Sequence, residues 1–259
     1  SMWWAGAYFQ MEDLPLLRED LHAVDVVVMI RCAWDDELED FMSLARSRGV
    51  RLCYDVDDLV CHPKYMPQMI EALGLDKGTE WNFWFGLTAR HSMILNACDF
   101  MIVTNEYLAG HLKNDFGKPC YVIKNYLNWI QEDVSQQYFE EKILLDAQKP
   151  FLIGYFSGSP THKKDLMTAM PELEEFLMAH ENAVLQIVGF MELPEAYIGL
   201  VDRGKIRFVS FQTVTGLQYE QAKADVNIVP LVNNEFSNCK SELKYFESAV
   251  VGTITCATP

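Results

Sequence analysis

The stretch that decides the fold reads FLIGYFSGSPTHKKD and covers residues 151–165. It opens with an apolar run, Phe151–Tyr155, which predicts a buried strand, and a turn of glycine and serine follows. A helical segment is expected from about 163 to 179. Strand, tight turn and helix in this order form the repeating unit of parallel α/β sheets. We therefore expect this stretch to begin a Rossmann-like domain.

The same alternation extends from this stretch in both directions. On the C-terminal side the pattern predicts four more strands, at 183–188, 206–209, 226–229 and 253–256, and two helices, at 216–224 and 241–250. On the N-terminal side it predicts strands at 26–30, 50–54, 100–103 and 120–123, and helices at 35–48, 80–97 and 105–116. The fold class is therefore α/β, with two Rossmann-like domains in tandem. Their expected bounds are 1–127 and 150–259, and the polar, acidic segment 128–149 is predicted to be a helical connector.

The composition excludes several classes of protein. Half of the 259 residues are hydrophobic and the formal net charge is −16, so the chain is globular in composition and repels polyanions such as nucleic acid. No apolar run approaches the roughly 20 residues of a membrane span. Seven scattered cysteines without a C-x-x-C motif argue against a disulfide framework or a structural zinc site, and they favour a reducing, cytoplasmic location.

Three polar clusters follow expected strands, and ligands of open parallel sheets bind at the carboxyl ends of strands. The first cluster is Asp55-Val56-Asp57-Asp58. Its carboxylates repel one another unless a partner compensates them. They are candidates for a general base, for a group that accepts a substrate hydroxyl, or for a divalent-metal site. In the alternative interpretation, one aspartate caps the next helix and the others face water.

The second cluster is the turn after 151–155. Gly158 and Ser159 offer free backbone N–H groups before a helix start, and Lys163 stands beside them, so the turn is a candidate anion site. His162 is a candidate catalytic residue because it adjoins this turn. The stretch matches neither the Walker loop nor G-x-G-x-x-G. An ordinary strand-to-helix turn with Thr161 as the N-cap is the alternative.

The third cluster lies at 238–247. Lys240 and Ser241 stand at an expected helix start, which suits a phosphate group. In the helix itself an apolar stripe of Leu243, Phe246 and Val250 is interrupted by Glu247. A sheltered carboxylate needs a partner. That partner is either the hydroxyl pair of a ligand or Lys244.

Four segments together resemble bacterial group 1 (family four) glycosyltransferases of the GT-B fold, nearest to the branch that makes O-antigen and other surface polysaccharides. They are YDVDDLV (54–60), VIKNYLN (122–128), IGYFSGSPTHKKD (153–165) and NIVPLVNNEFSNCKSELKYFESAVVGTITCATP (227–259). The resemblance covers about 25–259 and implies two facing Rossmann-like domains. It also implies a nucleotide-sugar donor held mainly by the C-terminal domain, retention of anomeric configuration, and no essential metal or other cofactor.

The resemblance also implies roles for individual residues. Glu247 matches the glutamate that ends the family's E-x7-E signature and holds the donor ribose. The donor diphosphate would be held by Gly158, Ser159, Lys163, Lys240 and Ser241, and Lys244 is a further candidate for binding the donor nucleotide. Asp57 or Asp58 would orient the acceptor hydroxyl or take its proton.

Three features depart from the family's pattern. Cys239 stands where the signature has its first glutamate, and Lys124 replaces the usual proline before Asn125. The chain is also short for the family, so we expect it to be an excerpt or one module of a larger protein. The expected partners are a nucleotide sugar, a glycan or lipid-linked glycan acceptor, and other modules that could bring the chain to the inner face of the membrane.

Two other functions remain open at this stage. The first is a metal-dependent GT-A transferase that uses the D-x-D of Asp55 and Asp57. The second is a non-catalytic glycosyltransferase module that acts as a binding or scaffold domain, which the cysteine at 239 favours.

Overall fold

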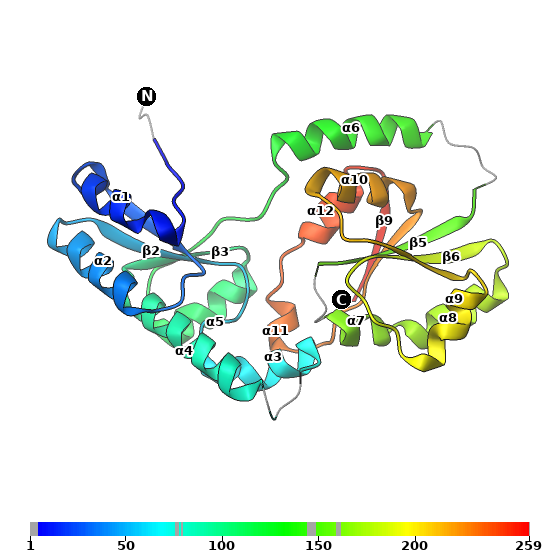
Figure 1. Cartoon of the computed structure of the whole chain (residues 1–259), viewed down its shortest axis with the longest axis horizontal. Helices are drawn as coiled ribbons and strands as arrows, with labels where there is room; N and C mark the ends of the chain where they lie inside the picture. Colours follow the sequence, from blue (N-terminus) through cyan, green and yellow to red (C-terminus); the bar gives the residue numbers. More distant parts are fainter. Residues whose placement is uncertain (1–4, 76–77, 79, 144–148, 159–161, 259) are drawn as a thin grey trace. The chain divides into compact units, whose positions relative to one another are not determined.

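The structure is a computed structural model that describes residues 5–75, 78, 80–143, 149–158 and 162–258. The chain forms two compact units. Unit 1 comprises Ser1–Met66 and Asn82–Ile123, and unit 2 comprises Pro67–Trp81 and Lys124–Pro259. Each unit is built on its own parallel sheet, so the predicted α/β class is confirmed (Figure 1).

Unit 1 contains a four-stranded parallel sheet in the order β1-β2-β3-β4. Its strands are β1 (Val26–Ile30), β2 (Arg51–Val56), β3 (Phe100–Val103) and β4 (Cys120–Val122). Its helices are α1 (Leu14–Asp20), α2 (Asp36–Ser47), α4 (Trp81–Ala97) and α5 (Glu106–Phe116), with 3-10 turns at Met11–Asp13, Leu21–Ala23 and Pro63–Tyr65. The predicted strands of this half are present because each is a short apolar run bounded by turn residues.

Strand β1 buries one of its two faces. Val27 and Met29 are buried, and Figure 1 shows α2, α4 and α5 along one side of the sheet. The residues that alternate with them, Val26, Val28 and Ile30, are 38%, 44% and 52% exposed. We call these three side chains the open face of β1.

Unit 2 contains a five-stranded parallel sheet in the order β7-β6-β5-β8-β9. Its strands are β5 (Phe151–Ser157), β6 (Ala183–Gly189), β7 (Ile206–Val209), β8 (Val226–Val229) and β9 (Ile254–Ala257). Its helices are α3 (Met66–Leu73), α6 (Trp129–Ile143), α7 (Lys163–Met167), α8 (Met170–Ala179), α9 (Ile198–Asp202), α10 (Val214–Lys223), α11 (Glu235–Asn238) and α12 (Leu243–Ala249), with a 3-10 turn at Glu195–Tyr197. Among the described residues, none of the helices of either unit combines the length and the hydropathy that a bilayer crossing requires.

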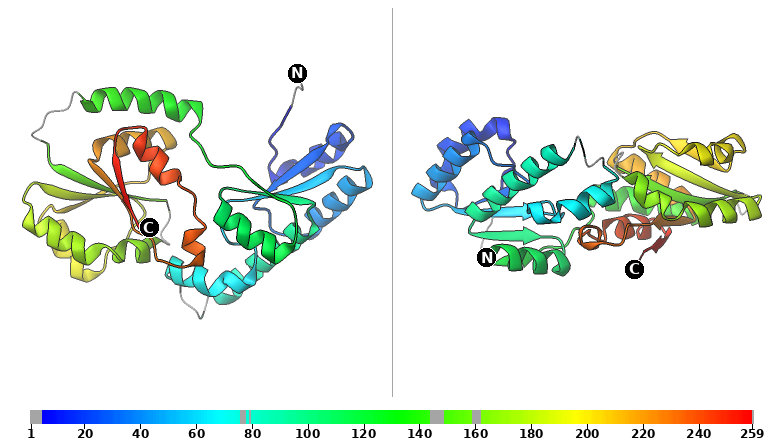
Figure 2. Two further views of the ribbon diagram at one scale, coloured as in Figure 1. Left: turned by 180° about the vertical axis from the view of Figure 1, so that it is seen from behind. Right: turned by 90° about the horizontal axis from the view of Figure 1, so that it is seen from below.

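Helices cover both faces of the sheet of unit 2. On one face, residues of β5 and β6 pack with α7, α8 and α9 into a continuous apolar core. On the other face α10 lies against the sheet, and α6 lies over α10 (Figures 1 and 2). Because both faces are covered, β5 is buried over almost its whole length.

The prediction of a single helix at 163–179 is wrong. Two helices, α7 and α8, take its place, and Pro171 lies in the first turn of α8. A proline fits the first turn of a helix but not its interior, where it removes a hydrogen bond and clashes with the preceding turn. The chain therefore breaks its helix at residues 168 and 169.

The segment Pro67–Trp81 groups with unit 2, although it falls inside the expected domain 1–127. Asn234 donates a hydrogen bond to the backbone oxygen of Gln68 (3.1 Å), and Lys164 forms an ion pair with Glu71 (3.5 Å). These contacts fix α3 to the elements that follow β8 and β5.

Candidate functional site

The candidate site of unit 2 lies at the carboxyl ends of β5 and β8, which are neighbours in the sheet. Ser157 ends β5, and the exposed Gly158 follows it. Ser159, which the sequence analysis placed in the anion turn, lies outside the described residues. Strand β6 lies on the other side of β5, and its last residue, Gly189, has a φ of +100° and pairs with Ser157. A Cβ at 189 would lie 2.0 Å from the backbone oxygen of Ser157, so this close approach requires glycine.

Two lysines gather at this edge. The Nζ of Lys244 donates to the backbone oxygen of Phe156 at 2.8 Å and lies 5.8 Å from the centre of the Tyr155 ring. Burial lowers the pKa of Lys244, and the neighbouring charge of Lys240 lowers that pKa further. The ammonium of Lys240 lies 4.9 Å over the Phe236 ring. The charges of Asp165 and Glu247 raise the pKa of Lys244, so two cations and two carboxylates act on one another at the end of β5.

Lys240 and Ser241 were expected at a helix start, and this expectation is wrong. They lie between α11, which ends at Asn238, and α12, which begins at Leu243. The Oγ of Ser241 accepts a hydrogen bond from the side-chain amide of Asn125 at 2.9 Å. A loop rather than a helix terminus therefore positions this pair.

The apolar stripe predicted around Glu247 is also wrong. Helix α12 is only seven residues long; its buried residue is Ser248, and Phe246 is 36% exposed. Glu247 is nevertheless half-buried, and burial raises the pKa of its carboxyl group. A hydrogen bond from Gln221 and the charge of Lys244 act in the opposite direction on that pKa. Gln221 is thus a partner of Glu247 that no pattern in the sequence indicates.

His162 is joined to a buried carboxylate. Its Nδ1 lies 3.0 Å from Oδ2 of Asp165, and the other oxygen of Asp165 accepts the backbone N–H of Val232, also at 3.0 Å. Val232 lies in the loop that follows β8, so Asp165 connects the segments after both central strands. Lys163, the next residue after His162, is exposed. The sequence pattern indicates His162 as a candidate but gives no signal for Asp165.

The candidate acceptor residues lie in unit 1 at the carboxyl end of β2. Asp57 forms an ion pair with Arg31 (3.1 Å), and Asp58 lies 3.8 Å from the same guanidinium group. Arg31 follows β1 and has a φ of +48°, a strained conformation for a residue other than glycine. Asp55 lies within β2, where burial and then the charge of Asp57 raise the pKa of its carboxyl group. Arg31 is the compensating cation that this acidic cluster requires.

All seven cysteines are free, and Cys239 is fully buried. In the part of the chain that the structure describes, no three His, Cys, Asp or Glu side chains are grouped so that they could hold a metal.

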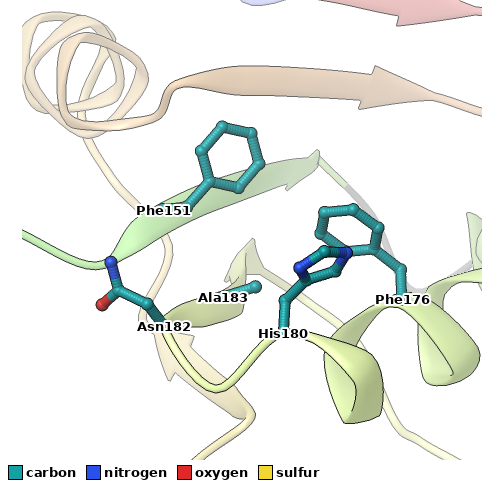
Figure 3. A pocket seen from close by; sticks show the side chains of 5 residues that line it. All are labelled: Phe151, Phe176, His180, Asn182 and Ala183. Atoms are coloured by element: carbon teal, nitrogen blue, oxygen red, sulfur yellow. The ribbon is translucent and has the colours of Figure 1, made fainter.

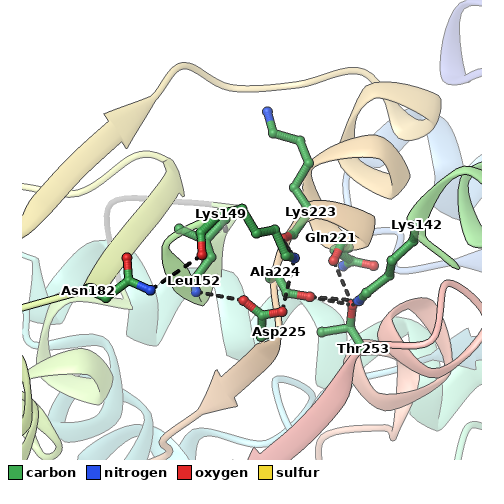
Figure 4. Close-up of polar contacts among 9 residues, drawn as sticks. All are labelled: Lys142, Lys149, Leu152, Asn182, Gln221, Lys223, Ala224, Asp225 and Thr253. Atoms are coloured by element: carbon green, nitrogen blue, oxygen red, sulfur yellow. Dashed lines mark hydrogen bonds and ion pairs between the residues drawn. The ribbon is translucent and has the colours of Figure 1, made fainter. Parts of the chain in front are cut away.

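Two further features lie at the amino ends of the same strands of unit 2. One is a shallow cavity of about 280 Å³ at the start of β5, lined by Phe151, Phe176, His180, Asn182 and Ala183 (Figure 3). The other is the ammonium of Lys142 on α6, which donates to the backbone oxygen of Ala224 (2.7 Å) and to Thr253 (2.8 Å; Figure 4). Burial lowers the pKa of Lys142 to about 8. Both features lie at the edge opposite to that at which open α/β sheets bind ligands.

Comparison with known proteins gives matches in structure but not in sequence. No protein-family model matches the chain, and no curated protein matches it. The chain is similar in structure to WaaG, a glycosyltransferase involved in lipopolysaccharide biosynthesis, with a TM-score of 0.55 and 14% identity over 85% of this chain and 63% of that one.

Two other solved structures are similar over more of the chain. For sucrose-phosphate synthase from Thermosynechococcus elongatus the TM-score is 0.57, with 17% identity over 96% of this chain and 62% of that one. For an alpha-glucosyltransferase in complex with UDP-glucose and DNA the TM-score is also 0.57, with 10% identity over 95% of this chain and 64% of that one. The fold of this chain is thus that of GT-B glycosyltransferases, and the chain spans a little less than two thirds of the length of these neighbours.

Proposed function

We propose that this chain transfers a sugar from a nucleotide-sugar donor to a hydroxyl group of a glycan or lipid-linked glycan acceptor in the synthesis of a cell-surface polysaccharide. The proposed transfer retains the anomeric configuration and needs no metal ion. Support comes from the GT-B fold and from one neighbour that is a glycosyltransferase of lipopolysaccharide biosynthesis. The quoted motifs support the same assignment.

The observation that carries the proposal is the lysine pair at the end of β5. Burial and then the charge of Lys240 lower the pKa of Lys244, while the carboxylates of Asp165 and Glu247 act in the opposite direction, so the folded chain keeps two cations close enough to repel each other. Such an arrangement is typical of a functional site, because a bound anion removes the repulsion. In a chain with a net charge of −16, a local pair of cations is also what a diphosphate needs.

The chemistry of the proposed reaction follows from these charges. The nucleoside diphosphate gains negative charge as its bond to the sugar breaks, and ammonium groups already in place stabilise that charge without reorganisation. Glu247 is proposed to accept hydrogen bonds from the ribose hydroxyls. Asp57 or Asp58 is proposed to orient the acceptor hydroxyl or to take its proton, with Arg31 holding the carboxylate.

The test is calorimetry with UDP, GDP and dTDP. We expect at least one of them to bind, and Lys240→Ala and Lys244→Met each to weaken the binding by about 1–3 kcal/mol, the usual contribution of a hydrogen bond to a charged group. Binding of the corresponding nucleoside should hardly change. Lys113→Ala, which removes an exposed lysine of α5 in unit 1, is the matched control for net charge and should bind as the wild type does.

Two outcomes would contradict the proposal. A folded wild-type chain that gives no heat with any of the three diphosphates would favour the non-catalytic scaffold instead. Transfer activity that disappears in excess chelator would favour a metal-dependent transferase that uses Asp55 and Asp57.

A further inference from the structure

Asp165 is a buried carboxylate whose two oxygens both have protein partners. Its side chain is 4% exposed, and each of its oxygens has a protein partner: Oδ2 is 3.0 Å from Nδ1 of His162, and Oδ1 accepts the N–H of Val232. The negative charge of Asp165 also acts on Lys244, whose pKa it raises against the effect of burial. Folding therefore buries a charge here and builds partners around it from three segments of unit 2.

The contact with Asp165 determines which nitrogen of His162 carries the proton. A carboxylate can only accept, so Nδ1 must be the donor, and in the neutral ring Nε2 then holds the lone pair. The imidazole of His162 is 18% exposed, whereas Asp165 is nearly inaccessible. The backbone oxygen of His162 in turn accepts a hydrogen bond from the hydroxyl group of Tyr155 at 3.0 Å, which ties this position to β5.

The groups at this edge thus divide by hydrogen-bonding type. Lys240 and Lys244 can only donate, which suits the oxygens of a diphosphate. Nε2 of His162 can accept, which suits a hydroxyl group. We propose that Asp165 is a positioning residue of the donor site, which holds His162 in the Nδ1–H tautomer so that Nε2 accepts a hydrogen bond from a hydroxyl group of the donor sugar. This inference rests on the proposed function for its ligand, but its tautomer can be measured without any ligand.

The first experiment reads that tautomer directly. Long-range proton–nitrogen correlation spectra of the full chain labelled with ¹⁵N-histidine distinguish Nδ1–H from Nε2–H, and the signal of His162 is assigned by its loss in His162→Gln. We expect wild-type His162 to be the Nδ1–H tautomer and Asp165→Asn to shift it toward a mixture. A wild-type Nε2–H tautomer would overturn the proposal, and that result needs no variant of Asp165 to fold.

The second experiment separates the sugar from the nucleotide. UDP and UDP-glucose are the probes, and we expect Asp165→Asn to weaken UDP-glucose binding by about tenfold, the loss of one hydrogen bond, while UDP binding changes by less than about twofold. An equal loss for both probes would show a merely structural role and would overturn the proposal.

The matched control is Asp225→Asn. Asp225 also accepts a backbone N–H, that of Leu152 at 2.8 Å, and also pairs with a cation, Lys149, but at the opposite edge of the sheet (Figure 4). This variant should leave the tautomer and both affinities unchanged. If the wild type binds neither probe, the donor assignment fails together with the proposed function, whereas the tautomer of His162 is still decided by the spectra.

Discussion

Replacement of Gly189 by alanine tests whether the end of β5 depends on its close approach to β6. The new Cβ would lie 2.0 Å from the backbone oxygen of Ser157, and real Cβ contacts stay beyond 3.0 Å, so the two strand ends must separate by about 1 Å. The positive φ costs a further 1–2 kcal/mol or so for a residue with a side chain. With the weakened contacts between the strand ends, we expect a total loss of about 3–5 kcal/mol in the free energy of unfolding.

Gly204 provides the control for this experiment. Its φ is +71°, but an added Cβ would meet nothing within 4 Å, so Gly204→Ala carries the backbone strain without the collision. We expect it to cost about 1–2 kcal/mol. Denaturant titration and thermal unfolding of both variants measure the difference, and each kcal/mol corresponds to about 2–4 °C in Tm for a unit of this size. Equal losses in the two variants would refute the argument that the Ser157 oxygen requires glycine at 189.

Three more predictions concern charged groups. Burial lowers the pKa of Lys142 to about 8, so the folded chain holds fewer protons than the unfolded chain between pH 8 and 10.5. The stability of the wild type relative to Lys142→Met should therefore rise by about 1–3 kcal/mol across that window. Urea titrations at several pH values measure this rise. Arg31→Gly removes both the strained φ and the partner of Asp57, and we expect Tm to stay within about 2 °C or to rise while the rate of sugar transfer falls at least about tenfold; a parallel fall in Tm would contradict this. Glu247→Gln should weaken UDP binding at least about tenfold with little change in Tm. Because burial raises the pKa of Glu247, the wild-type affinity for UDP should begin to fall at a higher pH than it would with an ordinary glutamate. A variant that melts early but binds UDP normally would make Glu247 a structural residue.

The elements that the sequence predicts correctly are those with a strong local signal. β1 and β3 have the predicted bounds because each is an uninterrupted apolar run. The shortest helices give no such signal, since about one turn cannot establish a 3.6-residue period, and α9 and α11 were therefore not predicted. The error at 163–179 has a local cause that the sequence does contain, namely Pro171.

The candidate site shows the limit of local patterns more clearly. That Asp57 needs a cation follows from its neighbours, but Arg31 lies 26 residues away in the chain and becomes adjacent because β1 and β2 pair in parallel. The partner of Asp165 is also distant in the chain, since Val232 belongs to the loop after β8. The stripe around Glu247 failed for another reason: α12 is too short, and the expected period was continued beyond its end.

The open face of β1 has a practical consequence for anyone who produces this protein. Strand β1 is at the edge of its sheet and presents Val26, Val28 and Ile30 to water, and an apolar edge strand is a template on which other chains can add strands. We therefore expect this strand to promote self-association of the protein in concentrated solution. Val28→Lys would place a charge in the middle of this surface while leaving the buried Val27 and Met29 unchanged, and it should reduce this self-association.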